Sequence, residues 1–152
     1  MSDFEVVQFQ KAQADGVDVF YRAAGDPSFP VILLLHGFPA SSFQFRNLIP
    51  LLAKKYRVIA PDLPGFGFTV VPDGRKYEYT FDNLAKTIQA FLDVLKISRF
   101  AVYVFDYGVS NKQSSLFDSI HQRITVGTDG FPSCCFKAFP DNSHYKPKWK
   151  CV

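Results

Sequence analysis

Residues 99–108 read RFAVYVFDYG, a continuous apolar run that ends in a carboxylate and a glycine. The six residues of this run from Phe100 to Phe105 do not alternate between apolar and polar side chains, which predicts a parallel strand covered on both faces. A side chain on the turn after such a strand projects into the ligand site of an open α/β sheet. Asp106 is therefore a candidate functional residue, but this stretch alone favours the structural alternative, an N-cap for a following helix.

The chain before this run alternates between strand and helix patterns. Two short strands, 4–10 and 17–24, flank Asp15-Gly16, which predicts an antiparallel hairpin with a tight turn. Buried strands are predicted at 31–35 and 57–60, and helices at 42–55, with a bend at Pro50, and at 80–95. This order predicts an α/β fold in which the hairpin leads into a mostly parallel sheet flanked by helices.

Composition indicates a globular chain. Its 152 residues are 47% hydrophobic and 16% aromatic, which is enough for one domain with a core. No apolar run approaches the length of a membrane span, and the N-terminus lacks the basic and apolar regions of a secretory signal. We therefore expect a cytoplasmic protein that does not associate with membranes.

The net charge of +3 comes from the C-terminal part of the chain. Residues 109–152 hold 6 Lys/Arg and 3 Asp/Glu, whereas residues 1–108 hold 11 of each. These basic residues are sparse and no aromatic-basic repeat accompanies them, so we expect no nucleic-acid partner. Cys134, Cys135 and Cys151 match neither zinc spacing nor a disulfide framework, and the sequence predicts no metal and no cofactor.

Three motifs follow the three core strands: HGFP at 36–39, PDLPGFG at 61–67 and VFDYG at 104–108. Together they resemble the α/β-hydrolase superfamily (AB hydrolase-1), and within it the aspartate-nucleophile branch of epoxide hydrolases and haloalkane dehalogenases. The resemblance implies an incomplete α/β-hydrolase fold without a cap domain. It divides the chain into the N-terminal half of a hydrolase domain, 1–108, and a divergent tail, 109–152, which we expect to pack poorly after about residue 126.

The resemblance also implies roles for individual residues. Asp106 takes the place of the nucleophile at the elbow turn, where it would form an ester with a small epoxide or alkyl halide. The backbone N–H groups of Phe38 and Tyr107 would hold the leaving oxygen or halide. Supporting positions of the motifs are His36, Gly37, Pro39, Asp62, Gly65, Gly67 and Gly108. For His36 the favoured interpretation is orientation of its loop.

The sequence departs from the family after Gly108. The family uses a His base and a further acid downstream of the elbow, but His121 follows too soon and His144 lies in a segment without resemblance. We therefore expect at most one alkylation of Asp106 and no turnover of an epoxide or haloalkane at a rate typical of the family. The alternatives are an inactive truncated or mis-spliced product, or a non-enzymatic interaction protein on a partial hydrolase fold. The particular substrate and the oligomeric state stay open.

Two further patterns bear on these interpretations. Gly65-x-Gly67 after a strand hints at a dinucleotide loop, but Val70 replaces the third glycine, which favours a structural turn. Val109-Ser110 is what an unspliced 5′ donor of the form GT-N-AGT encodes in frame, which predicts a retained intron or a shifted frame from residue 109 onward. The run HQRITV at 121–126 resembles the family and is the main observation against a retained intron or shifted frame.

Overall fold

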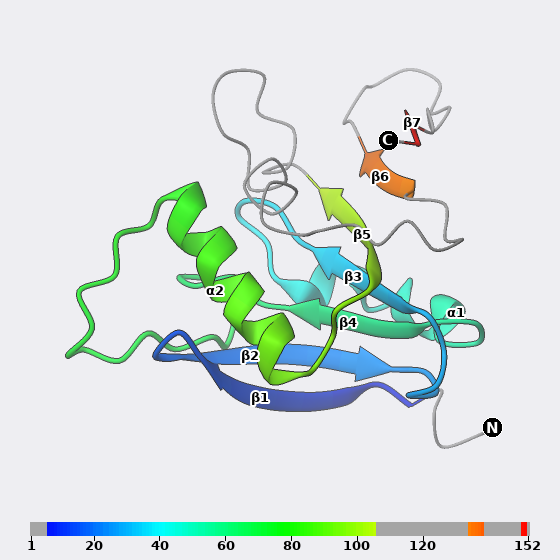
Figure 1. The fold of residues 1–152 in the computed structure, drawn as a ribbon, viewed down its shortest axis with the longest axis horizontal. Coiled ribbons are helices and arrows are strands. Elements are labelled where there is room, and N and C mark those ends of the chain that lie inside the picture. The colour runs from blue at the N-terminus through cyan, green and yellow to red at the C-terminus, as the bar shows by residue number, and fades with distance from the viewer. Residues whose placement is uncertain (1–5, 106–133, 139–149, 152) are drawn as a thin grey trace.

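The computed structural model describes residues 6–105, 134–138 and 150–151 (Figure 1). Its strands follow one another across the sheet in the order β1-β2-β4-β3-β5-β6-β7. Their bounds are Gln8–Ala14 (β1), Val17–Ala24 (β2), Val31–Leu35 (β3), Arg57–Pro61 (β4), Phe100–Phe105 (β5), Cys134–Ala138 (β6) and Lys150–Cys151 (β7). The helices are η2 (Ser42–Phe45), α1 (Ile49–Leu52) and α2 (Phe81–Val94). The mixed sheet with an N-terminal antiparallel hairpin confirms the predicted partial α/β-hydrolase fold.

The opening hairpin turns at Asp15-Gly16, as predicted. Both residues have positive φ, 51° and 70°, which the tight two-residue turn of a twisted hairpin requires. A two-residue loop forces pairing to start directly beside it, so Ala14 pairs with Val17 and the register continues to Gln8 opposite Ala23. The predicted first strand, 4–10, is therefore placed too early: β1 runs from Gln8 to Ala14.

The three predicted core strands lie side by side in one sheet. β3 pairs in parallel with β4 on one side and with β5 on the other. β2 joins the opposite edge of β4 in the antiparallel sense, which connects the hairpin to the parallel core. All three core strands therefore end at the same edge of the sheet.

Helices cover both faces of this sheet (Figure 1). α2 lies across one face, where Ile88 and Phe91 pack in a core cluster with Leu33, Leu35 and Ile59. Thr80 is its N-cap, accepting a hydrogen bond from Asn83 N, and Leu95 is its C-cap, which confirms the helix predicted at 80–95. On the other face, Phe45 and Ile49 pack against the opposite side of β3 and β4.

The prediction of one bent helix at 42–55 is wrong. The structure has a single 3-10 turn, η2, capped by Ser41, and a separate four-residue helix, α1, in which Pro50 lies in the first turn. Proline has no N–H and its ring clashes with the carbonyl four residues earlier, whereas the first turn of a helix tolerates it. Pro50 therefore begins a new helix instead of bending a long one.

The tail contributes two short strands among the described residues. β6 pairs in parallel with β5, and β7 pairs with β6 in the antiparallel sense. The sequence pattern predicts no strand here, because turn residues surround this segment. The remainder of 109–152 lies outside the described residues, so the boundary at residue 108 and the expected poor packing stay predictions. No helix in the described part of the chain has the length and apolarity needed to cross a membrane.

Candidate active site at the carboxyl edge of the sheet

The loops after β3 and β4 meet at the edge where β5 ends. Leu35, the last residue of β3, pairs with Val104 of β5, so the HGFP loop begins next to Phe105, the last residue of β5. The next residues of the chain are Asp106, Tyr107 and Gly108, which lie outside the described residues. The assignments of these three residues therefore stay predictions.

His36 connects the two loops. Its side chain is completely buried, Nε2 accepts a hydrogen bond from Leu63 N at 2.9 Å, and Nδ1 lies 3.0 Å from the carbonyl oxygen of Gly37. Nδ1 must carry the proton, because a carbonyl oxygen can only accept. Burial lowers the pKa of His36, which favours this neutral form. Both ring nitrogens are therefore engaged: Nε2 links the HGFP loop to the loop after β4, and Nδ1 bonds within the HGFP loop.

Asp62 organises the loop after β4. Its carboxylate is completely buried and accepts hydrogen bonds from Ser42 N at 2.7 Å and Phe68 N at 2.8 Å. Its carbonyl oxygen accepts a further bond from Thr69 Oγ1 at 2.7 Å. Backbone N–H donors on both sides stabilise the buried carboxylate. Asp62 thereby joins the start of η2 to the residues that follow the PGFG turn.

The two glycines of PGFG are required by the same loop. Both have positive φ, 87° at Gly65 and 55° at Gly67. A Cβ atom at Gly67 would lie 1.9 Å from Asp62 Oδ2, and one at Gly65 would lie 2.8 Å from the ring of Tyr79. These glycines therefore make a structural turn around Asp62, which is the interpretation that the sequence analysis favours over a dinucleotide loop.

Phe38 lies at the tip of the HGFP loop. Its side chain is 61% exposed, a turn bond joins Gly37 O to Ala40 N, and the peptide bond between Phe38 and Pro39 is cis. The Phe38 ring meets Phe66 edge-on at 6.2 Å, and Phe66 meets His36 edge-on at 5.4 Å. The structure thus places an aromatic wall beside the end of β5, with Phe38 in it.

A cavity of about 600 Å³ lies between the PGFG loop and the start of α2. Its lining comprises Pro64, Gly65, Phe66, Tyr79, Thr80, Phe81, Asp82 and Leu84. Phe66 belongs both to this lining and to the aromatic wall, so the cavity and the wall adjoin each other. Sequence reasoning missed Phe66, Tyr79 and Phe81. The only available signal was the position of Phe66 inside a motif, because the segment containing Tyr79 has no periodicity.

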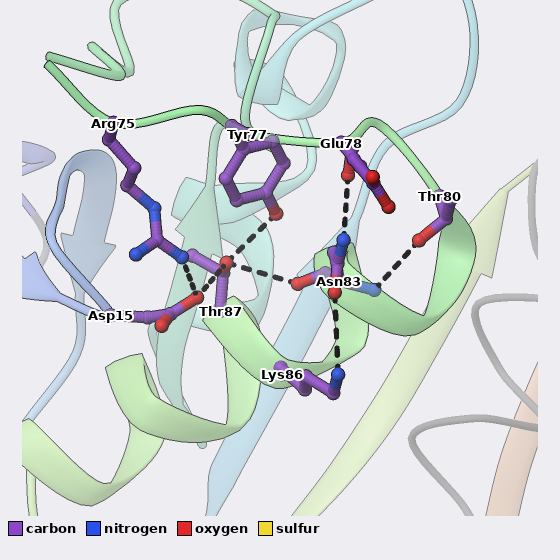
Figure 2. Close-up of polar contacts among 8 residues, drawn as sticks. All are labelled: Asp15, Arg75, Tyr77, Glu78, Thr80, Asn83, Lys86 and Thr87. Carbon is purple, nitrogen blue, oxygen red and sulfur yellow. Dashed lines mark hydrogen bonds and ion pairs between the residues drawn. The ribbon is translucent and has the colours of Figure 1, made fainter.

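A polar network holds the segment that carries Tyr79 (Figure 2). Asp15 Oδ2 accepts bonds from an Arg75 guanidinium nitrogen at 2.7 Å and from Thr87 Oγ1 at 2.9 Å. The Tyr77 hydroxyl lies 2.9 Å from Thr87 Oγ1 and donates to it if the one Thr87 proton points to Asp15. Burial raises the pKa of Tyr77, so it stays a donor. The network joins the hairpin turn, this segment and α2.

No group of three His, Cys, Asp or Glu side chains that could hold a metal ion occurs among the described residues.

Comparison with known proteins identifies the family. A family model described as alpha/beta hydrolase fold matches residues 30–108. Uncharacterized hydrolase YNR064C of Saccharomyces cerevisiae is 57% identical over 104 residues, which cover 68% of this chain and 35% of the relative. A haloalkane dehalogenase of Psychrobacter cryohalolentis is 38% identical over 91 residues, covering 59% and 30%. Epoxide hydrolase 4 of Homo sapiens is 35% identical over 100 residues, covering 66% and 27%.

Solved structures agree with these relatives. A loop variant of the haloalkane dehalogenase DbeA from Bradyrhizobium elkanii superposes with a TM-score of 0.62 at 34% identity, over 66% of this chain and 32% of that one. Cfl2 from Burkholderia cenocepacia superposes with a TM-score of 0.67 at 27% identity, over 79% and 39%. The chain spans about a third of the length of the curated relatives it matches. It belongs to the α/β-hydrolase fold family, close to the haloalkane dehalogenases and epoxide hydrolases.

Proposed function

We propose that this chain carries the nucleophile portion of a hydrolase that opens small epoxides or displaces halide from alkyl halides, with Asp106 as the nucleophile. The observation that carries the proposal is the pairing of Leu35 with Val104, because it brings the HGFP loop beside the end of the strand that leads to Asp106. The relatives named as a haloalkane dehalogenase and an epoxide hydrolase support this substrate class.

The first chemical step needs only a carboxylate and a place for the leaving group. One oxygen of Asp106 forms a bond to an sp³ carbon of the substrate, and the carbon–halogen bond breaks to release halide. With an epoxide, the ring C–O bond breaks and the oxygen takes a proton from water. The N–H groups of Phe38 and Tyr107 would stabilise the charge on the leaving atom.

The second step, hydrolysis of the ester by water, needs a general base. His36 does not fit this task, because it is completely buried and both its ring nitrogens are engaged, Nε2 with Leu63 N of the other loop and Nδ1 with Gly37 O of its own loop. His121 and His144 lie outside the described residues. We therefore propose that this chain forms the ester once per molecule and does not release it at a rate typical of the family.

Intact-protein mass spectrometry tests this proposal. The chain is incubated separately with styrene oxide and with 1-bromohexane, and peptide mapping then locates the modification. We expect one adduct per molecule at Asp106, with one bromide released per chain from the second reagent. Asp106→Asn should abolish the adduct, whereas Asp93→Asn, which removes an exposed carboxylate on α2, should leave it unchanged.

Three outcomes would contradict the proposal. An equal adduct on Asp106→Asn, with both variants folded by circular dichroism, would mean that the reagents modify the surface without selection. The absence of any adduct would favour the non-enzymatic interaction protein. Sustained turnover that disappears in Asp106→Asn would support Asp106 as the nucleophile, but it would refute the proposal that the ester forms only once per molecule.

A further inference from the structure

One face of the opening hairpin carries a group of exposed aromatic rings. α2 covers the face toward which Ala14, Val17 and Val19 point, so by strand alternation Phe9, Phe20 and Arg22 lie on the other face. There, Phe9 is 63% exposed, Phe43 of η2 54% and Phe68 63%. We call this set, Phe9, Phe20, Arg22, Phe43, Arg46 and Phe68, the arginine–phenylalanine face.

Arg22 lies at the centre of this face. It is only 8% exposed, and its guanidinium carbon lies 4.8 Å from the centroid of Phe9, 5.4 Å from that of Phe20 and 5.6 Å from that of Phe43. Its Nε atom is buried without a hydrogen-bond partner, and no carboxylate of the described residues forms an ion pair with it. Burying an unpaired charge is costly, and cation–π contacts offset only part of that cost.

The charges around Arg22 favour an anionic partner. Arg46 stacks on Phe43 at 4.6 Å and donates to its carbonyl oxygen, so two guanidinium groups flank one exposed ring. By alternation along the hairpin, Lys11 and Asp18 share this face, and Asp18 already accepts a bond from Gln13. Three cations therefore share this face with Asp18, which is already engaged, and the buried carboxylate of Asp62 beside it is engaged by Ser42 N and Phe68 N.

The position of β1 suggests how a partner would reach Arg22. β1 is the edge strand of the sheet, and Phe9 on it pairs directly with Arg22 on β2. An extended peptide that adds a strand to this edge places alternate side chains over the same face. One of its carboxylates would then reach the guanidinium, and its neighbouring apolar side chains would contact Phe9 and Phe68.

We propose that the arginine–phenylalanine face is a docking surface for an extended acidic segment of another protein, with Arg22 as the residue that pairs with its carboxylate. A second copy of this chain is a poorer occupant, because a symmetric contact would bring like-charged guanidinium groups together. A nucleic acid is a poorer occupant because residues 1–108 carry equal numbers of basic and acidic residues. This inference is independent of the chemistry at Asp106.

Fluorescence anisotropy with a labelled octapeptide of alternating glutamate and valine tests the proposal. We expect saturable binding that weakens at least tenfold in Arg22→Met, and also when glutamine replaces every glutamate of the peptide. Arg22→Met should unfold at the same temperature as the original chain or higher, because an unpaired buried charge is removed. Lys86→Met, which removes an exposed cation on α2, is the matched control and should bind normally.

Each opposite result would overturn the inference. The inference fails if the original chain shows no saturable binding, or if Arg22→Met binds the glutamate peptide as tightly as the original chain does. It also fails if the glutamine peptide binds as tightly as the glutamate peptide, or if a single-stranded oligonucleotide of eight nucleotides binds more tightly. Self-association lost in Arg22→Met, measured by analytical ultracentrifugation, would assign the face to a second copy instead.

Discussion

Asp62 and Gly67 form a pair in which each residue explains the other. The buried carboxylate needs N–H donors on both sides, and the chain can bring Phe68 N to it only by passing close to the carboxylate at Gly67. A side chain at Gly67 is excluded twice, by positive φ and by the carboxylate itself. The motif PDLPGFG therefore encodes one compact turn. Among the residues that the structure describes, the contacts of Asp62 serve to hold this turn together.

We expect Gly67→Ala to lower the free energy of unfolding by about 2–4 kcal/mol, because positive φ and the clash with Asp62 both oppose the added methyl group. Urea unfolding monitored by circular dichroism measures this difference. Gly74→Ala is the matched control, since no atom lies within 4 Å of the Cβ position there. Its effect should stay within about 0.5 kcal/mol. Equal effects of the two substitutions would refute the proposed clash.

His36 should make stability depend on pH. Burial lowers its pKa below the ordinary value of 6.5, so between these two values the unfolded chain binds a proton that the folded chain does not. The free energy of unfolding is therefore greatest above pH 6.5 and falls as the pH drops below it, by at most about 1.4 kcal/mol per pH unit.

His36→Gln keeps an acceptor for Leu63 N and cannot titrate. We expect this variant to be less stable than the original chain at pH 8 by about 1–3 kcal/mol, with a smaller loss between pH 7 and pH 5. Urea titrations at several pH values measure how steeply the free energy of unfolding changes with pH in each of the two proteins. Parallel slopes for the two proteins would mean that His36 does not contribute to the acid sensitivity.

At the scale of elements, Thr87 connects α2 with the hairpin turn and with Tyr77 (Figure 2). Thr87 is completely buried, whereas Asp15 and Arg75 have side chains 31% and 35% exposed. Removing a buried hydroxyl leaves its hydrogen-bond partners unpaired. This lowers the free energy of unfolding more than the loss of a partly exposed ion pair, which contributes at most about 1 kcal/mol. The hydroxyl of Thr87 should therefore be the more important contact of the network.

We expect Thr87→Val to destabilise the chain by about 2 kcal/mol, and Arg75→Met by less than about 1 kcal/mol. Chemical denaturation of the two single variants measures both values. A larger effect of Arg75→Met would show that the ion pair dominates. The double variant Asp15→Asn/Thr87→Val should lose less stability than the single variants Asp15→Asn and Thr87→Val lose together, because the two residues share one hydrogen bond.

The elements predicted best are those whose own residues determine them. β3 and β5 are continuous apolar runs between breakers, and α2 has a capping threonine and one apolar face, so their bounds follow from local pattern. The segment from Ser42 to Leu52 was harder, because proline can bend a helix or begin one, and tertiary packing of Phe45 and Ile49 decides between them. β6 depends on pairing with a distant strand, which local pattern does not record.

At the scale of the whole molecule, the sequence predicts which strand ends share an edge, but it does not predict the aromatic contacts between the loops that follow them. The three motifs occupy strand ends that converge because parallel strands share an edge, a rule that applies to sequence alone. The contact of Phe66 with both His36 and Phe38, and the cavity beside Tyr79, arise from loops without periodicity. Such contacts depend on where the loops meet in space and could not be predicted from spacing.

The strand order β1-β2-β4-β3-β5 differs from the order in which a ribosome makes these strands. The hairpin can form as soon as Ala24 has emerged, but β3 then has no neighbour, because both its partners, β4 and β5, are synthesised later. The sheet therefore cannot grow strand by strand behind the ribosome. On stalled nascent chains of increasing length, we expect resistance to protease over residues 6–105 to appear in one step after Phe105 has left the exit tunnel, and stepwise protection starting at β3 would contradict this.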